Sequence, residues 1–178
     1  MALLPIITAP DPRLKKVAEA VDAVDCDVRR LMDDMLETMY AAPGVGLAAP
    51  QVGVLKRVIV TDVARAGEKP QPMHMANPEI IDASGDISVF EEGCLSLPEH
   101  FAEVKRPNTV RIRYLNYENE IREQDMDGFL ATCVQHEIDH LDGVLFVDHI
   151  SSLKRGIILR KLTKLKKVDA KAEAKAGA

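Results

Sequence analysis

The sequence predicts an α+β fold in which antiparallel or mixed β-strands pack around a central helix, with one helix before the strands and another at the C-terminal end. Three observations predict it: a helical apolar period near the start, short β-branched stretches in the middle, and two further helical segments after them. A chain of 178 residues has the length for a single domain with one core. We predict that domain over residues 1–168 and a disordered, low-complexity tail over 169–178.

The composition restricts the classes of protein. Hydrophobic residues make up 47% and charged residues 29%, as in soluble globular proteins. Aromatic residues make up only 4%, which argues against a surface that stacks nucleic-acid bases. The opening residues have no basic leader, and Pro5 interrupts their short apolar run, so we expect neither an export signal nor a membrane span. Three scattered cysteines then indicate the reducing cytoplasm.

The first helix is predicted within residues 25–44, where apolar residues recur every three or four positions. Asp25 or Asp27 can cap its start, and Pro43 with Gly44 can end it. We expect its methionines to fill the core.

Five stretches in the middle are β-branched or alternate between apolar and polar residues, as strands do. They lie at residues 57–62, 79–82, 87–92, 101–107 and 109–117. Turn residues separate them and no helical pattern intervenes, so antiparallel or mixed pairing is expected instead of repeated βαβ units.

The next helix, residues 127–143, contains the pattern HExxH. Positions four apart share one face of a helix, so His136 and His140 can both direct a ring nitrogen at one metal ion. Glu137 can touch a water on that ion without ligating it, which is the arrangement of a metal-dependent hydrolase.

The same pattern also arises by chance on polar helices. Here apolar residues fill much of the remaining surface of the helix, which indicates that it is buried. Buried histidines and a glutamate need partners, and a metal supplies them. Asp127 can cap this helix and Gly143 can end it.

A catalytic site of this kind needs a third protein ligand. Cys133 lies about 10 Å along the axis from the second histidine and is expected to be a packing residue. Cys94 follows a strand at a bend between a glycine and a proline, so the spacing favours Cys94 over Cys26. An HExxH zinc peptidase would instead take its third ligand downstream, where Asp148 and His149 are available.

The last helix is predicted from about Ser151 to Val168 and is strongly basic. Residues 151–178 hold nine Lys and Arg against Asp169 and Glu173, a net charge of +7 in a chain whose total is −5, so residues 1–150 carry −12. An acidic body with a basic end suggests contact with a polyanion. A solvated helix explains the same charge equally well.

Three stretches resemble, in order, the signatures of peptide deformylases, the metalloenzymes that remove the formyl group from new bacterial polypeptides. They are "GVGLAAPQ" at residues 44–51, "EGCLS" at 92–96 and "QHEIDH" at 135–140. The similarity extends over nearly the whole chain to about Val168. It implies one catalytic domain: a cytoplasmic hydrolase of protein biosynthesis that acts on N-formylmethionine and releases formate. The HExxH zinc peptidase stays as the alternative.

The resemblance also assigns roles at the metal. It implies Cys94, His136 and His140 as the ligands and Glu137 as the general base. The iron dependence of the family implies one Fe²⁺ ion, although Zn²⁺, Ni²⁺ or Co²⁺ can occupy the same ligands.

Around the substrate, the resemblance implies that the side-chain amide of Gln51 and the backbone N–H of Leu95 stabilise the oxyanion. It places Val45, Glu92, Arg106 and His136 around the methionine side chain and the peptide backbone. For Arg106, a surface charge is the alternative. Gly44 and Gly46 would let a peptide lie alongside the backbone, although by themselves they indicate only a turn.

The expected partners are N-formyl-methionyl peptides and no membrane. Because deformylases act on chains that leave the ribosome, the basic helix is a candidate anchor to ribosomal RNA. The alternative is a ribosome-associated factor without catalytic activity.

Overall fold

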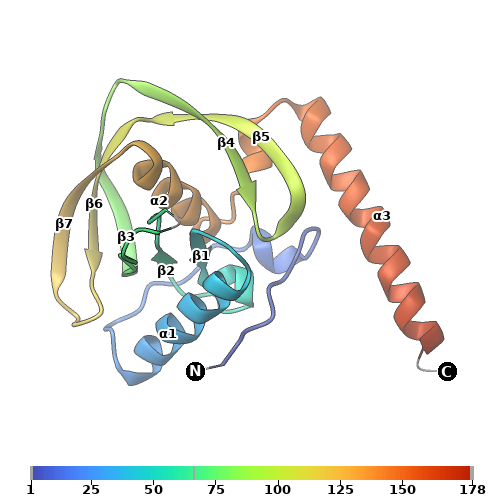
Figure 1. Ribbon diagram of the computed structural model, residues 1–178, viewed down its shortest axis with the longest axis horizontal. Helices are drawn as coiled ribbons and strands as arrows, with labels where there is room; N and C mark the ends of the chain where they lie inside the picture. The colour runs from blue at the N-terminus through green and yellow to red at the C-terminus, as the bar shows by residue number, and fades with distance from the viewer. Residues whose placement is uncertain (1, 66, 177–178) are drawn as a thin grey trace.

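The computed structural model describes residues 2–65 and 67–176. Its α-helices are α1 (Cys26–Ala41), α2 (Gly128–Leu141) and α3 (Ser152–Ala176), and its 3-10 helices are η1 (Pro12–Lys15), η2 (Ala49–Val52) and η3 (Phe146–His149). The strands are β1 (Gly46–Ala48), β2 (Val58–Thr61), β3 (Met73–Ala83), β4 (Ile87–Cys94), β5 (Leu97–Pro107), β6 (Thr109–Leu115) and β7 (Ile121–Asp127). The predicted α+β fold is confirmed (Figure 1).

The described strands form two sheets with antiparallel pairing. One sheet has the order β1-β2-β3-β6-β7, and the other pairs β4 with β5. Helix α2 contacts strands of both sheets, and β4 and β5 curve over it (Figure 1). The helix with the HExxH pattern is therefore central, as predicted.

Two strands lie outside the predicted set. β1 has only three residues and begins at Gly46, in a segment that the sequence indicated as a turn. β7 pairs with β6 from Ile121 to Asp127, but only Met126 of this strand is buried. A strand with so little buried surface lacks the alternation from which strands are recognised. β3 also begins earlier than predicted, at Met73.

Of three residues predicted to begin or end helices, two are confirmed and one is wrong. Asp25 caps α1, because its side chain accepts hydrogen bonds from the backbone of Asp27 and Val28 at 3.0 and 2.9 Å. Asp127 occupies the N-cap position of α2, but its side chain makes no capping bond to any described residue, so its predicted role as a side-chain cap is wrong. Gly143 follows α2 with φ of 71°, where a Cβ would lie 2.7 Å from the Lys15 carbonyl oxygen.

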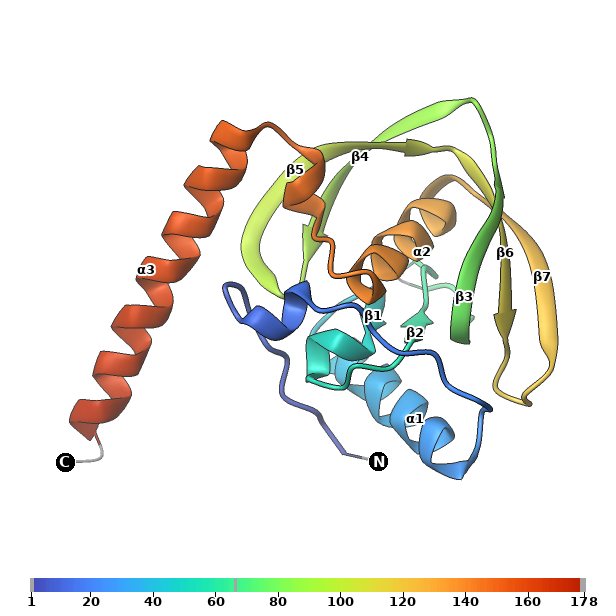
Figure 2. The ribbon, with the colours of Figure 1, turned by 180° about the vertical axis from the view of Figure 1, so that it is seen from behind.

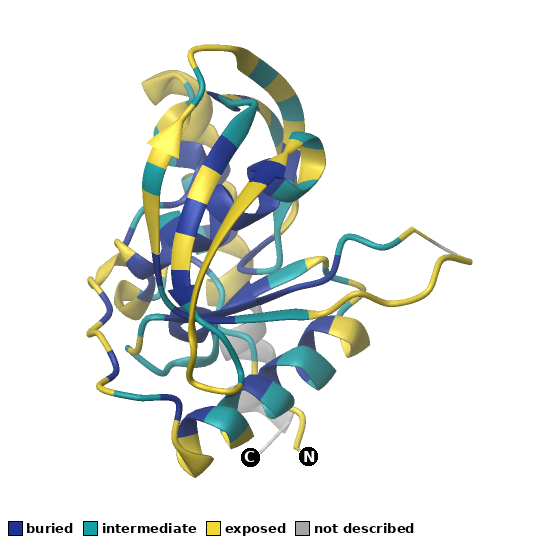
Figure 3. Ribbon diagram, turned by 90° about the vertical axis from the view of Figure 1, so that its left-hand side faces the viewer, coloured by how far each residue is buried: buried dark blue, intermediate teal, exposed yellow. Residues whose placement is uncertain are grey.

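Buried apolar side chains fill the space between these elements. Met32, Met35 and Met39 of α1 are fully buried, as predicted for its methionines, and pack against β1 and β2. Ile112 of β6 and Val134 of α2 belong to a second cluster, between α2 and the large sheet. Strands with one buried face show as alternating bands in Figure 3.

Helix α3 stands to one side of the sheets (Figure 2). Ile158 and Leu162 attach it to the body, packing in a third cluster with Leu97 of β5 and Phe146 of η3. In the part of the chain that the structure describes, no helix is long and apolar enough to be a candidate membrane span.

The end of α3 differs from the prediction. The helix continues to Ala176 and does not stop near Val168, because alanine, lysine and glutamate favour helix and neither glycine nor proline occurs between Val168 and Gly177. Gly177 and Ala178 lie outside the described residues. The division into a domain of residues 1–168 and a disordered tail stays a prediction.

Candidate active site

Three side chains with metal-binding chemistry meet where the end of β4 faces α2. One donor atom from each of Cys94, His136 and His140 lies within 4.8 Å of the other two, and Cys94 Sγ is 3.1 Å from His140 Nε2. The register of β4 against β5 shifts between Gly93, which pairs with Phe101, and Cys94, which pairs with Leu97, so the regular pairing is interrupted immediately before Cys94. One sulfur and two imidazole nitrogens are a suitable donor set for a divalent transition metal ion.

Glu137 is buried beside the two histidines. Burial raises its pKa to about 7, and its Oε2 has no hydrogen-bond partner among the described residues. A Cβ on Gly46 would lie 2.3 Å from Glu137 Oε1. Gly46 therefore does more than form a turn, because it leaves the space that this carboxylate occupies. A buried carboxylate with an unpaired oxygen can exchange a proton with a molecule bound next to it.

Gln51 is buried in η2, and its amide orientation is set by three contacts. The backbone N–H of Ala48 donates to Gln51 Oε1 at 2.8 Å. The amide nitrogen therefore faces the other way, toward Ser96 Oγ at 3.2 Å and Cys94 Sγ at 3.5 Å. The sequence did not single out Ser96, although it belongs to the stretch "EGCLS".

A cavity of about 390 Å³ lies beside the three donors. All of the predicted site residues line it except His140 and Arg106. Phe101 and Phe129 also line it and are exposed, so its rim is apolar. No sequence signal distinguished these two aromatic residues from other exposed residues of a strand and a helix.

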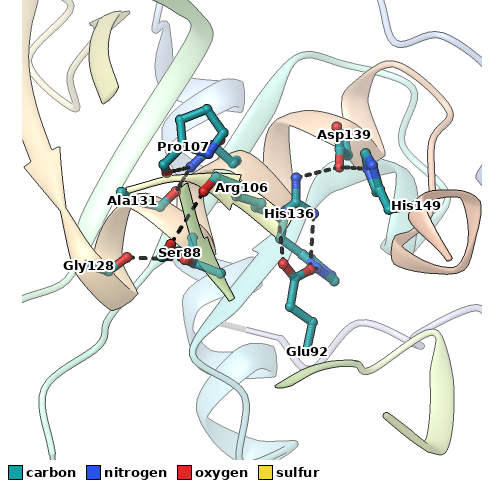
Figure 4. Close-up of polar contacts among 11 residues, drawn as sticks. Ser88, Glu92, Arg106, Pro107, Gly128, Ala131, His136, Asp139 and His149 are labelled. Atoms are coloured by element: carbon teal, nitrogen blue, oxygen red, sulfur yellow. Dashed lines mark hydrogen bonds and ion pairs between the residues drawn. The ribbon is translucent and has the colours of Figure 1, made fainter. Parts of the chain in front are cut away.

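Arg106 does not line the cavity and contacts Glu92 and Asp139 instead (Figure 4). Its guanidinium is bidentate on Glu92, with Nε to Oε1 at 2.6 Å and Nη2 to Oε2 at 3.0 Å. Glu92 Oε2 in turn lies 2.8 Å from His136 Nδ1. With 5% exposure Arg106 is not a surface charge, so that alternative is wrong.

The contacts of Glu92 lower its pKa. Burial alone would raise the pKa, but the hydrogen bonds from His136 and Arg106 and the guanidinium charge outweigh it and lower the pKa to about 2. Glu92 is therefore a carboxylate that holds His136 Nδ1 and leaves Nε2 for another partner.

The remaining candidate ligands lie elsewhere. Cys133 is buried, burial raises the pKa of its thiol well above the usual range, and Sγ contacts the Val45 carbonyl oxygen at 3.5 Å. Cys26 is exposed at the start of α1. Asp148 pairs with Arg155 at 3.0 Å, and His149 pairs with Asp139 at 2.7 Å. Neither downstream residue belongs to the donor group found in the described chain.

Comparison with known proteins identifies the family. The family model for polypeptide deformylase matches residues 3–156. The chain belongs to the polypeptide deformylase family. It is 57% identical to the peptide deformylase of Phenylobacterium zucineum, over 92% of this chain and 97% of that protein. As a deformylase it is a hydrolase that removes the formyl group from N-terminal methionine. The alternative of an HExxH zinc peptidase is therefore wrong.

Solved deformylase structures share the fold. The peptide deformylase of Ehrlichia chaffeensis superposes with a TM-score of 0.90 at 40% identity, covering 95% of this chain and 99% of that one. A class I type b deformylase from Acinetobacter baumannii, solved with Met-Ala-Ser bound, gives a TM-score of 0.79 at 38% identity over 84% of this chain and 99% of its own. Deformylases depend on a metal ion, and the Cys94, His136 and His140 group can bind one.

Proposed function

We propose that the deformylase reaction of this protein takes place at Cys94, His136 and His140, which hold one Fe²⁺ ion, with Glu137 as the general base. The observation that carries this proposal is the convergence of one sulfur and two imidazole nitrogens beside a buried carboxylate on a cavity. Three protein ligands leave a coordination position open for chemistry. Iron follows from the family resemblance, since this donor set also suits Zn²⁺, Ni²⁺ and Co²⁺.

Glu137 carries out both proton transfers of the proposed reaction. When bound, the metal ion would supply Lewis-acid chemistry, which lowers the pKa of water. A water molecule can then lose a proton near neutral pH and attack the formyl carbon. Glu137 accepts the proton of the attacking water and later donates a proton to the departing amine nitrogen. Glu137 lines the cavity, and its Oε2 has no hydrogen-bond partner among the described residues, which suits both steps.

The developing oxyanion needs donors that are already oriented. We assign this role to the Gln51 amide nitrogen and the backbone N–H of Leu95. The bond from Ala48 to Gln51 Oε1 supports the assignment, because it turns the NH₂ group toward Cys94. A preoriented donor in a buried site stabilises a developing negative charge without reorganising.

For the substrate, we propose that the peptide backbone lies along Gly44, Val45 and Gly46 while the methionine side chain enters the cavity. β1 is an edge strand of the large sheet, so one side of it is available for strand pairing. Arg106 takes a different part from the one expected, since it does not line the cavity, whereas Glu92 lines the cavity and also contacts His136. We assign both to holding His136.

The decisive experiment measures formate release from a formyl-Met peptide under anaerobic conditions, together with metal content. We expect iron in the active preparation, activity that declines in air, and persistent activity when Ni²⁺ replaces iron. Glu137→Gln should lower kcat by about 10²–10⁴-fold with the metal retained.

Cysteine variants test the ligand set. Cys94→Ala should lose the metal and the activity together, whereas Cys26→Ala, which changes an exposed cysteine at the start of α1, should keep both. Metal retained at full occupancy in Cys94→Ala would overturn the proposed ligand set.

We further propose that the enzyme acts in the cytoplasm and that α3 binds ribosomal RNA through its exposed lysines. Lys161, Lys164 and Lys167 are exposed on α3. Changing all three to glutamate should weaken ribosome binding and lower its salt dependence, because fewer counterions are released, while short-peptide activity stays unchanged. The matched control changes the exposed lysines Lys16, Lys56 and Lys69 of the body. Equal ribosome affinity in both triple variants would contradict the anchor.

A further inference from the structure

From His136, a chain of charged side chains begins at Glu92 on the cavity lining and continues through Arg106 to the partly exposed Asp139 and His149 (Figure 4). His136 Nδ1 faces Glu92, which is held by Arg106. Arg106 Nη1 then donates to Asp139 Oδ2 at 2.9 Å, and His149 Nε2 lies 2.7 Å from the same oxygen. Glu92 and Arg106 are almost completely buried, whereas the side chains of Asp139 and His149 are 22% and 35% exposed.

The helix itself separates Asp139 from the reacting groups. Successive residues of an α-helix are about 100° apart, so Glu137 and Asp139 lie on opposite sides of the line through His136 and His140. Glu137 lines the cavity, whereas Asp139 is absent from its described lining. Asp139 therefore does not line the cavity, and its hydrogen-bonded connection to His136 runs through Arg106 and Glu92.

The backbone near Arg106 is also held by side chains of α2 and β4. Gln135 Nε2 donates to the Pro107 carbonyl oxygen at 3.0 Å, and Ser88 Oγ donates to the Arg106 carbonyl oxygen at 3.4 Å. With its backbone held, the guanidinium depends on its carboxylate partners for orientation. Glu92 accepts hydrogen bonds from Nε and Nη2 of Arg106, and Asp139 accepts one from Nη1.

We propose that Asp139 is a positioning residue for the metal-binding ring of His136, acting through Arg106 and Glu92, with His149 holding Asp139 in place. The inference rests on the proposed ligand set. A guanidinium with carboxylates on two sides has one orientation, and a carboxylate held in this way fixes both the tautomer and the plane of the imidazole. Without Asp139, Nη1 of a buried arginine loses its partner, and the guanidinium reorients at the expense of Glu92.

The test uses Asp139→Asn, which preserves shape and removes the charge. The matched control is Asp142→Asn. Asp142 lies at the same end of α2, and the change removes its ion pair with Arg57, in which the charged atoms are 2.6 Å apart. For each purified variant, Zn²⁺ affinity is measured by competition with a chelator, and the visible ligand-field bands are recorded with Co²⁺ bound. Unfolding midpoints of the metal-free proteins show whether each variant keeps its fold.

We expect Asp139→Asn to weaken Zn²⁺ binding by roughly threefold to tenfold, below the 10–100-fold typical of a partner that bonds a ligand directly. Its Co²⁺ bands should shift, while Asp142→Asn matches the wild type in both measurements. His149→Gln should shift affinity in the same direction by less. Because a purely structural role would not move the Co²⁺ bands, unchanged bands and affinity in Asp139→Asn overturn the inference, as do equal changes in Asp142→Asn.

Cys94→Ala separates the two possible failures. If Cys94→Ala loses Zn²⁺ while Asp139→Asn binds it like the wild type, the inference alone is wrong. If Cys94→Ala binds Zn²⁺ as tightly as the wild type, the proposed ligand set is wrong.

Discussion

At the scale of single residues, space around Glu137 decides the geometry of the site. Its carboxylate occupies the position where a side chain on Gly46 would begin, and Cys133 Sγ would lie 2.9 Å from the same Cβ. Both neighbours belong to α2, whose side chains there are buried, so they have little freedom to move aside. A glycine in β1 thus leaves the space for a carboxyl group on a helix that is far away in the sequence.

Gly46→Ala should therefore lower kcat/KM for a formyl-Met peptide by roughly 10²-fold, the size expected when a catalytic group moves by about 1 Å. Gly85→Ala is the matched control, because a Cβ there meets no described atom within 4 Å. Steady-state kinetics at equal metal content compare the two variants. Wild-type kcat/KM in Gly46→Ala would show that Glu137 tolerates the displacement.

At the scale of elements, the ends of the helices are set by local chemistry of unequal strength. Asp25 satisfies two backbone N–H groups at the start of α1. Helix α2 begins without such a bond from Asp127 and is held by burial, since most of its side chains are in the core. A helix with a buried surface of this extent is stabilised mainly by packing.

Asp25→Ala should lower the free energy of unfolding by about 0.5–2 kcal/mol, because the first turn of α1 loses its cap. Asp22→Ala, an exposed position just before the helix, should change it by less than about 0.5 kcal/mol. Urea denaturation of both variants measures the difference. Equal values would mean that packing alone defines the start of α1.

At the scale of the whole molecule, the apolar side chains of α3 attach the helix to the body, whereas its exposed basic side chains are available for binding. Ile158 and Leu162 complete a cluster of buried residues with β5 and η3. The basic side chains of the same helix from Lys154 to Lys167 are exposed. Deleting the helix would therefore uncover part of the core, so point variants separate stability from binding better than truncation does.

Leu162→Ala should reduce the free energy of unfolding by about 2–5 kcal/mol, as for other buried leucines. Leu165→Ala, at 51% exposure against 4% for Leu162, should stay within about 0.5 kcal/mol of the wild type. Chemical denaturation distinguishes the two. A small effect of Leu162→Ala would mean that α3 contributes little to the fold.

The sequence by itself determined the features that depend on neighbours along the chain. The i, i+4 spacing brings His136 and His140 to one face, the apolar period buries α1 and α2, and the bend after β4 favours Cys94. Each of these rests on the fixed periodicity of a helix or strand, which requires no knowledge of distant contacts.

Only the tertiary structure decided what depends on residues far apart in sequence. The ion pairs of Arg106 with Glu92 and Asp139, the pairing of Gln51 with Ser96 and the strand β7 all arise from packing between separate elements. Their local sequences are compatible with several environments, because a polar side chain takes the orientation that its distant partners satisfy.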